Sequence, residues 1–364
     1  MASLSAYLRD HGVKVHVLRN APLLWGEKNL KADVPAGLTI TDVNADQDFK
    51  GNGQIYVDAV KRVLDREPID IIVYSVGPFY TLLTLRRIKK AYTHKQVVDF
   101  RDLWSYEQRG SKAHLTDLKY RLVQFLFRLS ERPAVASADG IVVVTPGDAA
   151  IMRKHYPKQR QKIEVILNGY DEVAFSAPIK RTDALSLQLV SLGKLGYYAP
   201  HLAQRLFEAL DTLELRDRSI KLVHVGPHEA AIESILPKVK NVTYECTGYV
   251  DYKQGLQIAY DSDVAVIVYN HPTGYGTKLF DYMAVNKPIL LITDEAKDLS
   301  ELVASLKNGF VCRSVADIQS AILTIVNQQI NTLDDQARTQ AYSRRAQNQR
   351  YLDYLRQLIT SRSA

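Results

Sequence analysis

The sequence predicts an α/β protein with two doubly wound domains, each a parallel sheet with helices on both faces. Short runs rich in Val, Ile and Leu alternate with amphipathic helical segments along most of the 364 residues. A polar segment, 168–186, interrupts this alternation and contains Pro178. The length and a hydrophobic content of 46% are sufficient for two separate cores.

The elements follow in order along the chain. In the first half, strands are expected at 13–18, 70–76, 95–100 and 140–145, and helices at 2–11, 54–66, 79–92 and 115–132. In the second half, strands are expected at 162–167, 187–193, 220–226, 242–248, 262–270 and 288–292, and helices at 201–213, 228–236, 252–260 and 277–285. The charged segment after residue 334 predicts a last helix. We therefore expect an N-terminal domain over 1–172, a second domain over 173–334 and a C-terminal helix within 335–364.

Composition excludes several classes of protein. Two cysteines, Cys246 and Cys312, are too few and too far apart for a disulfide framework or a zinc site, which favours a cytoplasmic protein. No apolar run approaches the ~20 residues that span a bilayer. The acidic pairs Asp46/Asp48 and Asp261/Asp263 lack partners for a divalent metal, so we expect no metal and no other cofactor.

A net charge of +7 suits an anionic partner, and two basic segments stand out, 85–95 and 119–132. In the second, an apolar stripe of Leu122, Phe125, Leu126 and Leu129 lies beside arginines. Two interpretations remain open: a helix packed on its own sheet, which is favoured, or a helix that lies on the inner, anionic face of a membrane. No base-stacking or nucleic-acid motif accompanies these segments, so nucleic acid is not expected as a partner.

The most informative segment is TGYGTKLFDYMAVNKPIL, residues 273–290. Gly274 and Gly276 allow the backbone to approach a diphosphate, and the helix that follows directs its first N–H groups and its dipole toward negative charge. Asp281 lies about one turn into that helix, where a carboxylate can accept hydrogen bonds from ribose hydroxyls. The alternative is an ordinary strand–loop–helix unit. Flanking strands place the loop at the carboxyl end of a parallel sheet, which is where such sheets bind ligands.

Together with DFRDLW (99–104), ADGIVVVTP (138–146), KIEVILNGYDEVAF (162–175) and SLGKLGYY (191–198), this segment resembles the family-4 glycosyltransferases of GT-B fold that build capsules, exopolysaccharides and lipid-linked glycans. The resemblance implies two Rossmann-like domains that face each other across a cleft. The second domain would bind the nucleotide sugar and the first the acceptor, while the last helix crosses back to the first domain.

The resemblance also implies a donor site. Asp281 matches the second acid of the family's Glu-x7-Glu motif, whereas Thr273 replaces the first. Lys194 matches the residue that neutralises the leaving diphosphate. Ala199 stands where a second lysine is common, and Lys278 either substitutes for it or faces solvent. The expected donor-binding residues are Gly193, Lys194, Thr273, Gly274, Tyr275, Gly276, Thr277, Lys278 and Asp281.

On the acceptor side, relatives place a histidine after the strand that here ends in VVDF, and this chain has Arg101 instead. Asp102 is the candidate for accepting or positioning the acceptor hydroxyl, and Arg101 for an orienting role. An Arg101–Asp102 ion pair that only holds the loop is the alternative. Ser75 to Pro78 end another strand at the same edge.

The first helix begins directly after Met1, whereas relatives begin with a central strand and a glycine-rich turn. We therefore expect unpaired strand edges in the first sheet. Either the start is truncated or misassigned, or a partner protein or second copy completes the domain.

Two functions follow. One is a retaining, metal-independent glycosyltransferase that moves a sugar from a nucleoside-diphosphate sugar to a glycan or lipid-linked acceptor. The other is a non-catalytic or partner-dependent GT-B subunit of a transferase complex. A sugar-nucleotide epimerase lacks a suitable set of carboxylates and histidines.

Overall fold

A computed structural model describes residues 2–20, 37–43, 49–76, 81–103, 105–106, 118–172, 186–215, 218–335 and 339–361. The chain forms two compact units, one of residues 1–167 and 345–364 and the other of residues 168–344. Several residues considered above lie outside the described residues, namely Asp46, Asp48, Gly77, Pro78, Trp104 and Pro178.

The first unit contains a four-stranded parallel sheet. Its order is β3 (Ile71–Val76), β4 (Lys95–Phe100), β5 (Gly140–Val143) and β6 (Ile163–Val165). The strand expected at 162–167 belongs to the first sheet, because Ile163 is in register with Ile141 of β5.

A second, smaller sheet in this unit pairs β1 (His16–Asn20) with β2 (Thr39–Val43) in parallel. Among the described strands, β1 and β2 are not hydrogen-bonded to the larger sheet, and β3 pairs with β4 alone. The helices of the unit are α1 (Ala2–Asp10), α2 (Phe49–Leu64), α3 (Leu82–Ala91), α4 (Leu118–Ser137) and α5 (Pro146–His155), with the 3-10 turn η2 (Pro157–Lys162).

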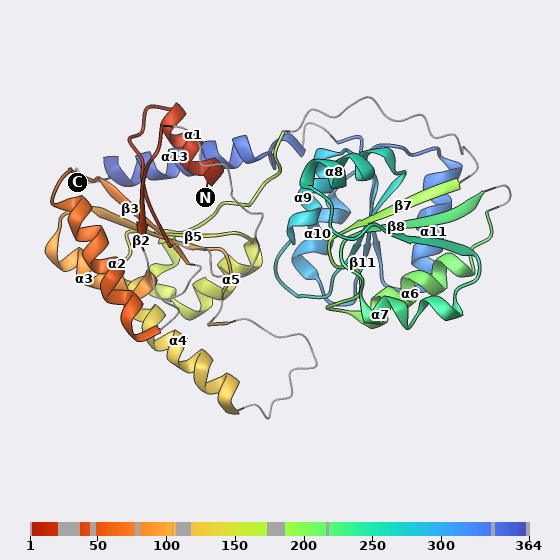
Figure 1. The fold of residues 1–364 in the computed structure, drawn as a ribbon, viewed down its shortest axis with the longest axis horizontal. Coiled ribbons are helices and arrows are strands. Elements are labelled where there is room, and N and C mark those ends of the chain that lie inside the picture. Colours follow the sequence, from red (N-terminus) through yellow and green to blue (C-terminus); the bar gives the residue numbers. More distant parts are fainter. Residues whose placement is uncertain are drawn as a thin grey trace. The chain divides into compact units, whose positions relative to one another are not determined.

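The last helix, α13 (Arg344–Thr360), returns to this unit and runs beside α1 (Figure 1). Its buried residues Tyr351, Leu352 and Leu355 share a core with Leu4 and Leu8 of α1. Asn348 donates a 3.0 Å hydrogen bond to the Ser3 hydroxyl. The prediction that the C-terminal helix crosses back to the first domain is confirmed.

Helix α4 contains the apolar stripe of the second basic segment. Its packed face carries Ala134 and Val135, which are fully buried in the core. The stripe that includes Phe125 and Leu126 is about half exposed instead, so the helix packs in its own unit through another face than this stripe.

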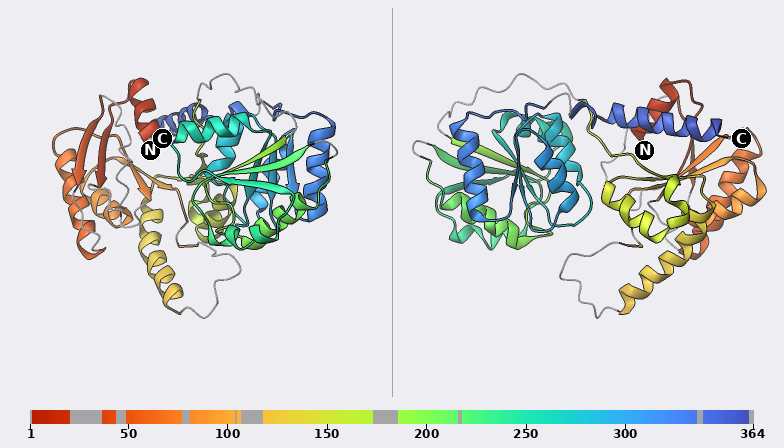
Figure 2. Two further views of the ribbon diagram at one scale, coloured as in Figure 1. Left: turned by 45° about the vertical axis from the view of Figure 1, so that its right-hand side comes forward. Right: turned by 180° about the vertical axis from the view of Figure 1, so that it is seen from behind.

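The second unit is a six-stranded parallel sheet in the order β12-β11-β10-β7-β8-β9. Its strands are β7 (Ser186–Leu192), β8 (Ser219–Val225), β9 (Val242–Cys246), β10 (Val264–Val268), β11 (Ile289–Ile292) and β12 (Gly309–Cys312). Its helices are α6 (Pro200–Asp211), α7 (Ala230–Glu233), η3 (Leu236–Lys238), α8 (Tyr252–Asp261), α9 (Thr277–Ala284), α10 (Lys297–Ser305) and α11 (Val315–Asn327). Helices lie on both faces of this sheet (Figure 2).

The strand order fixes where a ligand can bind in this unit. The chain proceeds outward from β7 to β8 and β9, then returns to β10 on the other side of β7. Loops that leave neighbouring strands in opposite directions open a crevice at the carboxyl ends of the strands. The loops after β7 and β10 therefore flank the position where a ligand is expected.

No helix within the described residues is both long and apolar enough to cross a membrane.

Candidate functional site

The loop after β10 ends in a glycine turn that opens α9. Gly274 and Gly276 have φ values of 96° and 64°, a left-handed conformation that glycine adopts without a steric penalty. Gly276 is the N-cap residue and has no side chain with which to cap the helix, so the first N–H groups of α9 are left for other acceptors. Thr277 begins α9 and is exposed. The glycine turn and the helix that follows it are therefore present, and their role as an anion cradle stays a prediction.

Thr273 is held in this loop through its carbonyl oxygen. The hydroxyl of Tyr269 donates to it at 3.2 Å, and Nδ1 of His271 lies 2.6 Å away. Tyr275 packs edge-on against Phe280 of α9, with 6.2 Å between ring centroids. The loop conformation thus depends on the aromatic residues on both sides of Thr273.

Asp281 lies one turn into α9 and is partly buried. The hydroxyl of Tyr252, at the start of α8, donates a 2.8 Å hydrogen bond to its carboxylate. Burial raises the pKa of Asp281, and this hydrogen bond opposes the rise. The carboxylate therefore accepts a hydrogen bond from one hydroxyl group at this edge of the sheet.

Two lysines come together beside the turn. The ammonium of Lys278 donates a 2.7 Å hydrogen bond to the carbonyl oxygen of Lys194, which fixes the loop after β7 to α9. Lys278 is thus partly buried and does not simply face solvent, and burial lowers its pKa to about 8. The Lys194 ammonium lies 3.8 Å from the ring centroid of Tyr197 and 3.3 Å from the Tyr198 hydroxyl, whose hydrogen bond raises the pKa of the lysine.

The loop that carries Lys194 is held by a carboxylate that sequence reasoning missed. Buried Glu229 accepts 2.7 Å hydrogen bonds from the backbone N–H groups of both Leu195 and Gly196. The imidazole of His224, also buried, lies 2.5 Å from the carbonyl oxygen of Gly193, whose φ is 68°. The segment GPHE (226–229) directly after a strand was the available signal for Glu229.

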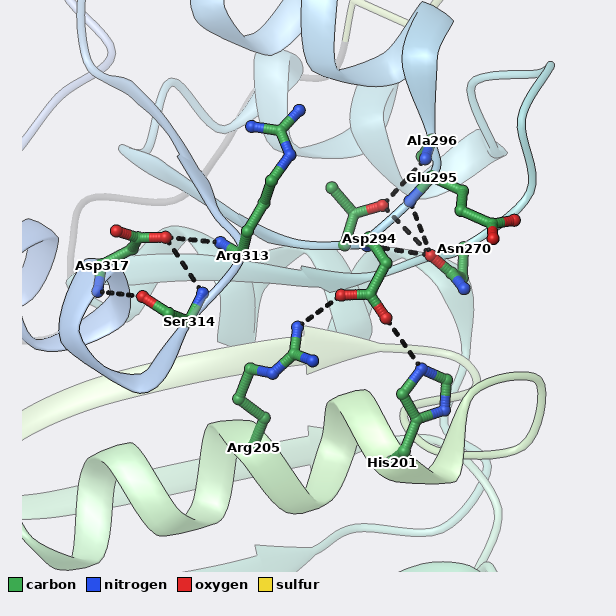
Figure 3. Close-up of polar contacts among 10 residues, drawn as sticks. His201, Arg205, Asn270, Asp294, Glu295, Ala296, Arg313, Ser314 and Asp317 are labelled. Atoms are coloured by element: carbon green, nitrogen blue, oxygen red, sulfur yellow. Dashed lines mark hydrogen bonds and ion pairs between the residues drawn. The ribbon is translucent and has the colours of Figure 1, made fainter.

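A second set of contacts braces the same edge (Figure 3). Asn270 accepts 2.9 Å hydrogen bonds from the backbone N–H groups of Asp294 and Glu295. The Asp294 carboxylate in turn pairs with Arg205 at 2.7 Å and His201 at 3.0 Å, both on α6. These contacts join the loops after β10 and β11 to each other and to α6.

Arg101 and Asp102 belong to the first unit, where they follow β4. Arg101 pairs with buried Asp99 at 2.7 Å, and the hydroxyl of Tyr351 on α13 donates to the same carboxylate oxygen at 3.2 Å. Burial raises the pKa of Asp99, and Arg101 opposes this. Asp102 is exposed and forms no ion pair among the described residues, so the alternative of an Arg101–Asp102 pair is wrong.

Within the part of the chain that the structure describes, no three His, Cys, Asp or Glu side chains gather in a way that could hold a metal ion.

Two protein families match the chain. Residues 1–173 match the family described as Glycosyltransferase Family 4, and residues 186–328 match the family described as Glycosyl transferases group 1. The chain is a GT-B glycosyltransferase, with a family 4 domain followed by a group 1 domain. No curated protein matches this glycosyltransferase significantly.

Solved structures share the fold of the glycosyltransferase at low sequence identity. Sucrose-phosphate synthase from Thermosynechococcus elongatus is 17% identical with a TM-score of 0.71, and the match covers 98% of this chain and 92% of that one. A glycosyltransferase from Rickettsia africae is 14% identical with a TM-score of 0.67, covering 100% and 94%. HepE from Anabaena, solved with UDP and glucose, is 16% identical with a TM-score of 0.62, covering 89% and 86%.

Proposed function

We propose that this glycosyltransferase takes its sugar from a nucleoside-diphosphate sugar bound by the second unit. The observation that carries the proposal is the glycine turn at the start of α9, with Asp281 one turn along that helix and the Lys278 ammonium on the backbone carbonyl of Lys194. The diphosphate would lie on the first N–H groups of α9, and the Asp281 carboxylate would accept from ribose hydroxyls. HepE, of the same fold, was also solved with UDP-glucose, which makes UDP-sugars the first donors to test.

The acceptor side of the proposal rests on Arg101 and Asp102. An acceptor hydroxyl would attack the anomeric carbon as the bond to the β-phosphate oxygen breaks, and its proton would pass to the departing diphosphate on the same sugar face, with retention. Exposed Asp102 would orient that hydroxyl. The proposed acceptor is a glycan or lipid-linked sugar in cytoplasmic capsule or exopolysaccharide synthesis, and the proposed reaction needs no metal.

Calorimetric titration with UDP, GDP, dTDP and ADP, without added metal, tests the donor site. We expect one nucleotide to bind, and Asp281→Asn to weaken it roughly tenfold or more, because a ribose hydroxyl loses a charged acceptor. Glu208→Gln, at an exposed position of α6, is the matched control. If none of the four binds to the folded chain, a partner-dependent subunit becomes the better description, and equal affinity in Asp281→Asn would remove Asp281 from the site.

Lys194 is proposed to act on the leaving group. Negative charge grows on the β-phosphate as the donor bond breaks, so an ammonium there stabilises the transition state more than the bound donor. We expect Lys194→Ala to lower kcat roughly a hundredfold with a smaller effect on nucleotide affinity. Donor hydrolysis measures kcat without a known acceptor, and Lys194→Arg should restore part of it. A pure loss of affinity would contradict this role.

A further inference from the structure

Helix α4 carries apolar side chains on two faces, and only one of them packs. The outer stripe, on the other face, consists of Leu122, Phe125, Leu126 and Leu129, which are 55%, 54%, 51% and 47% exposed. These positions recur every three or four residues, so they form one continuous surface along the helix. Contiguous apolar surface of this kind marks an interaction site, whereas single exposed apolar residues do not.

The position of α4 makes this surface accessible. The N-terminal half of the helix extends beyond the other elements of the first unit in all three views (Figures 1 and 2). The C-terminal half is anchored, because buried Glu131 accepts hydrogen bonds from Ser105 at 2.5 Å and Tyr156 at 2.6 Å. The outer stripe thus lies on an anchored helix and faces away from the core of its own unit.

A basic cleft adjoins the outer stripe. This open cavity of about 540 Å³ between α3 and α4 is lined by Arg86, Arg87 and Lys90 together with mainly apolar residues of both helices. Leu129 lies in its wall and so joins the cleft to the outer stripe. Arg87 donates to Gln54 at 3.1 Å, whereas Arg86 and Lys90 are exposed and form no ion pair among the described residues.

Apart from buried Glu131, the charges on these two helices are all positive. Helix α3 has four basic residues and no acidic one, and the single acid of α4, Glu131, is buried. A second copy of the chain would bring like charges together if it docked on this surface. A bilayer with anionic headgroups satisfies both features at once, since it offers negative charge beside an apolar layer.

We propose that the outer stripe and the basic cleft form a docking surface for a bilayer that contains anionic lipids. The apolar side chains enter the boundary between headgroups and acyl chains, and the cations of the cleft contact lipid phosphates. This proposal stands independently of the donor site, which belongs to the other unit.

Flotation of the full chain with vesicles tests it. We expect binding to vesicles of phosphatidylcholine with added phosphatidylglycerol, little binding to phosphatidylcholine alone, and weaker binding at high salt. Phe125→Ser/Leu126→Ser should reduce binding roughly tenfold or more. Arg86→Gln/Lys90→Gln should reduce it by a similar factor. All four side chains are exposed, so folding should persist, and circular dichroism verifies it.

The controls are matched changes in the second unit. Leu323→Ser removes an apolar side chain that is 37% exposed, and Lys238→Gln/Lys253→Gln removes two exposed cations. Neither control should alter vesicle binding. Nucleotide affinity should be unchanged in every variant, which separates this test from that of the donor site. Equal binding to both vesicle types, or unchanged binding in Phe125→Ser/Leu126→Ser, overturns the proposal. A third outcome also overturns it: the parent chain forms a dimer and does not bind lipid, and Phe125→Ser/Leu126→Ser dissociates that dimer. A second copy of the chain would then cover the surface.

Discussion

Of the two lysines in the proposed donor loops, Lys278 is the one whose charge changes at mildly alkaline pH. Burial lowers its pKa to about 8, although Glu229 and Asp281 oppose the shift. A bound diphosphate favours the ammonium and so raises this pKa again. Nucleotide affinity should therefore be constant below the free-enzyme pKa and fall as pH rises through it, by up to roughly tenfold per pH unit.

Titrations with the nucleotide that binds, at pH values from about 7 to 9.5, measure this effect. Lys278→Arg is the matched variant, because a guanidinium stays protonated over that range and should give a flat profile. The pKa of Lys194 is raised by its hydrogen bond with Tyr198, so this lysine should keep its charge throughout. A constant affinity in the parent chain, or an equal fall in Lys278→Arg, would assign the charge effect to another group.

At the scale of elements, one buried network joins α4 to the loop after β4. Glu131 of α4 accepts from Ser105 of that loop and from Tyr156, the residue after α5, and Tyr106 donates to the Tyr156 hydroxyl at 3.1 Å. Burial raises the pKa of Glu131, because the folded protein disfavours the carboxylate form. Ionisation of this group therefore lowers the free energy of unfolding at high pH, and that loss is recovered as the pH falls through the raised pKa.

Tyr156→Phe removes one donor to this buried carboxyl and should reduce the free energy of unfolding by about 1–3 kcal/mol. The loss should be larger at neutral than at acidic pH, because the hydroxyl stabilises the carboxylate more than the protonated acid. Urea denaturation followed by circular dichroism at two pH values measures it. Tyr249→Phe removes a hydroxyl from a side chain that is 86% exposed and should have almost no effect. Similar losses in both variants would show that the network does not stabilise the loop.

The elements also show what the sequence can predict. Strands β10 and β11 are buried on both faces and all their side chains are apolar, so their positions could be predicted. Helix α11 could have been found too, because Ser314 and Asp317 form a capping box at its start. The helix expected at 228–236 is shorter, since α7 ends at Glu233 and a 3-10 turn containing Pro237 follows.

Only the local part of the proposed donor site could be predicted from the sequence. Gly274, Gly276 and Asp281 lie in one segment, so their spacing carries the geometry. The contacts of Glu229 with the loop of Lys194 join residues more than thirty positions apart, and no local pattern encodes them. Arg101 shows the same limit, because its partner could be Asp99 or Asp102 from sequence and only the buried position of Asp99, beside Tyr351 of α13, decides it.

At the scale of the whole molecule, each unit has its own core, and α13 belongs to that of the first. Leu352 of α13 is 1% exposed and packs with Leu4, Leu8 and Val97, so Leu352→Ala should cost the first unit about 2–5 kcal/mol. Ile359→Ala, on the same helix at 39% exposure, should cost far less and serves as the control. Hydrogen exchange read by mass spectrometry can assign the loss to a unit.

Faster exchange is expected in peptides from β3, β4 and β5, which form the sheet beneath α13, and unchanged exchange in peptides from β7, β10 and β11. This outcome follows if the two cores unfold separately, as domains connected by only a few chain segments generally do. Nucleotide affinity should then survive Leu352→Ala, because the donor loops lie wholly within residues 168–344. Faster exchange in both sheets would mean instead that the two units unfold as one, and that removal of a buried contact under α13 also weakens the donor site.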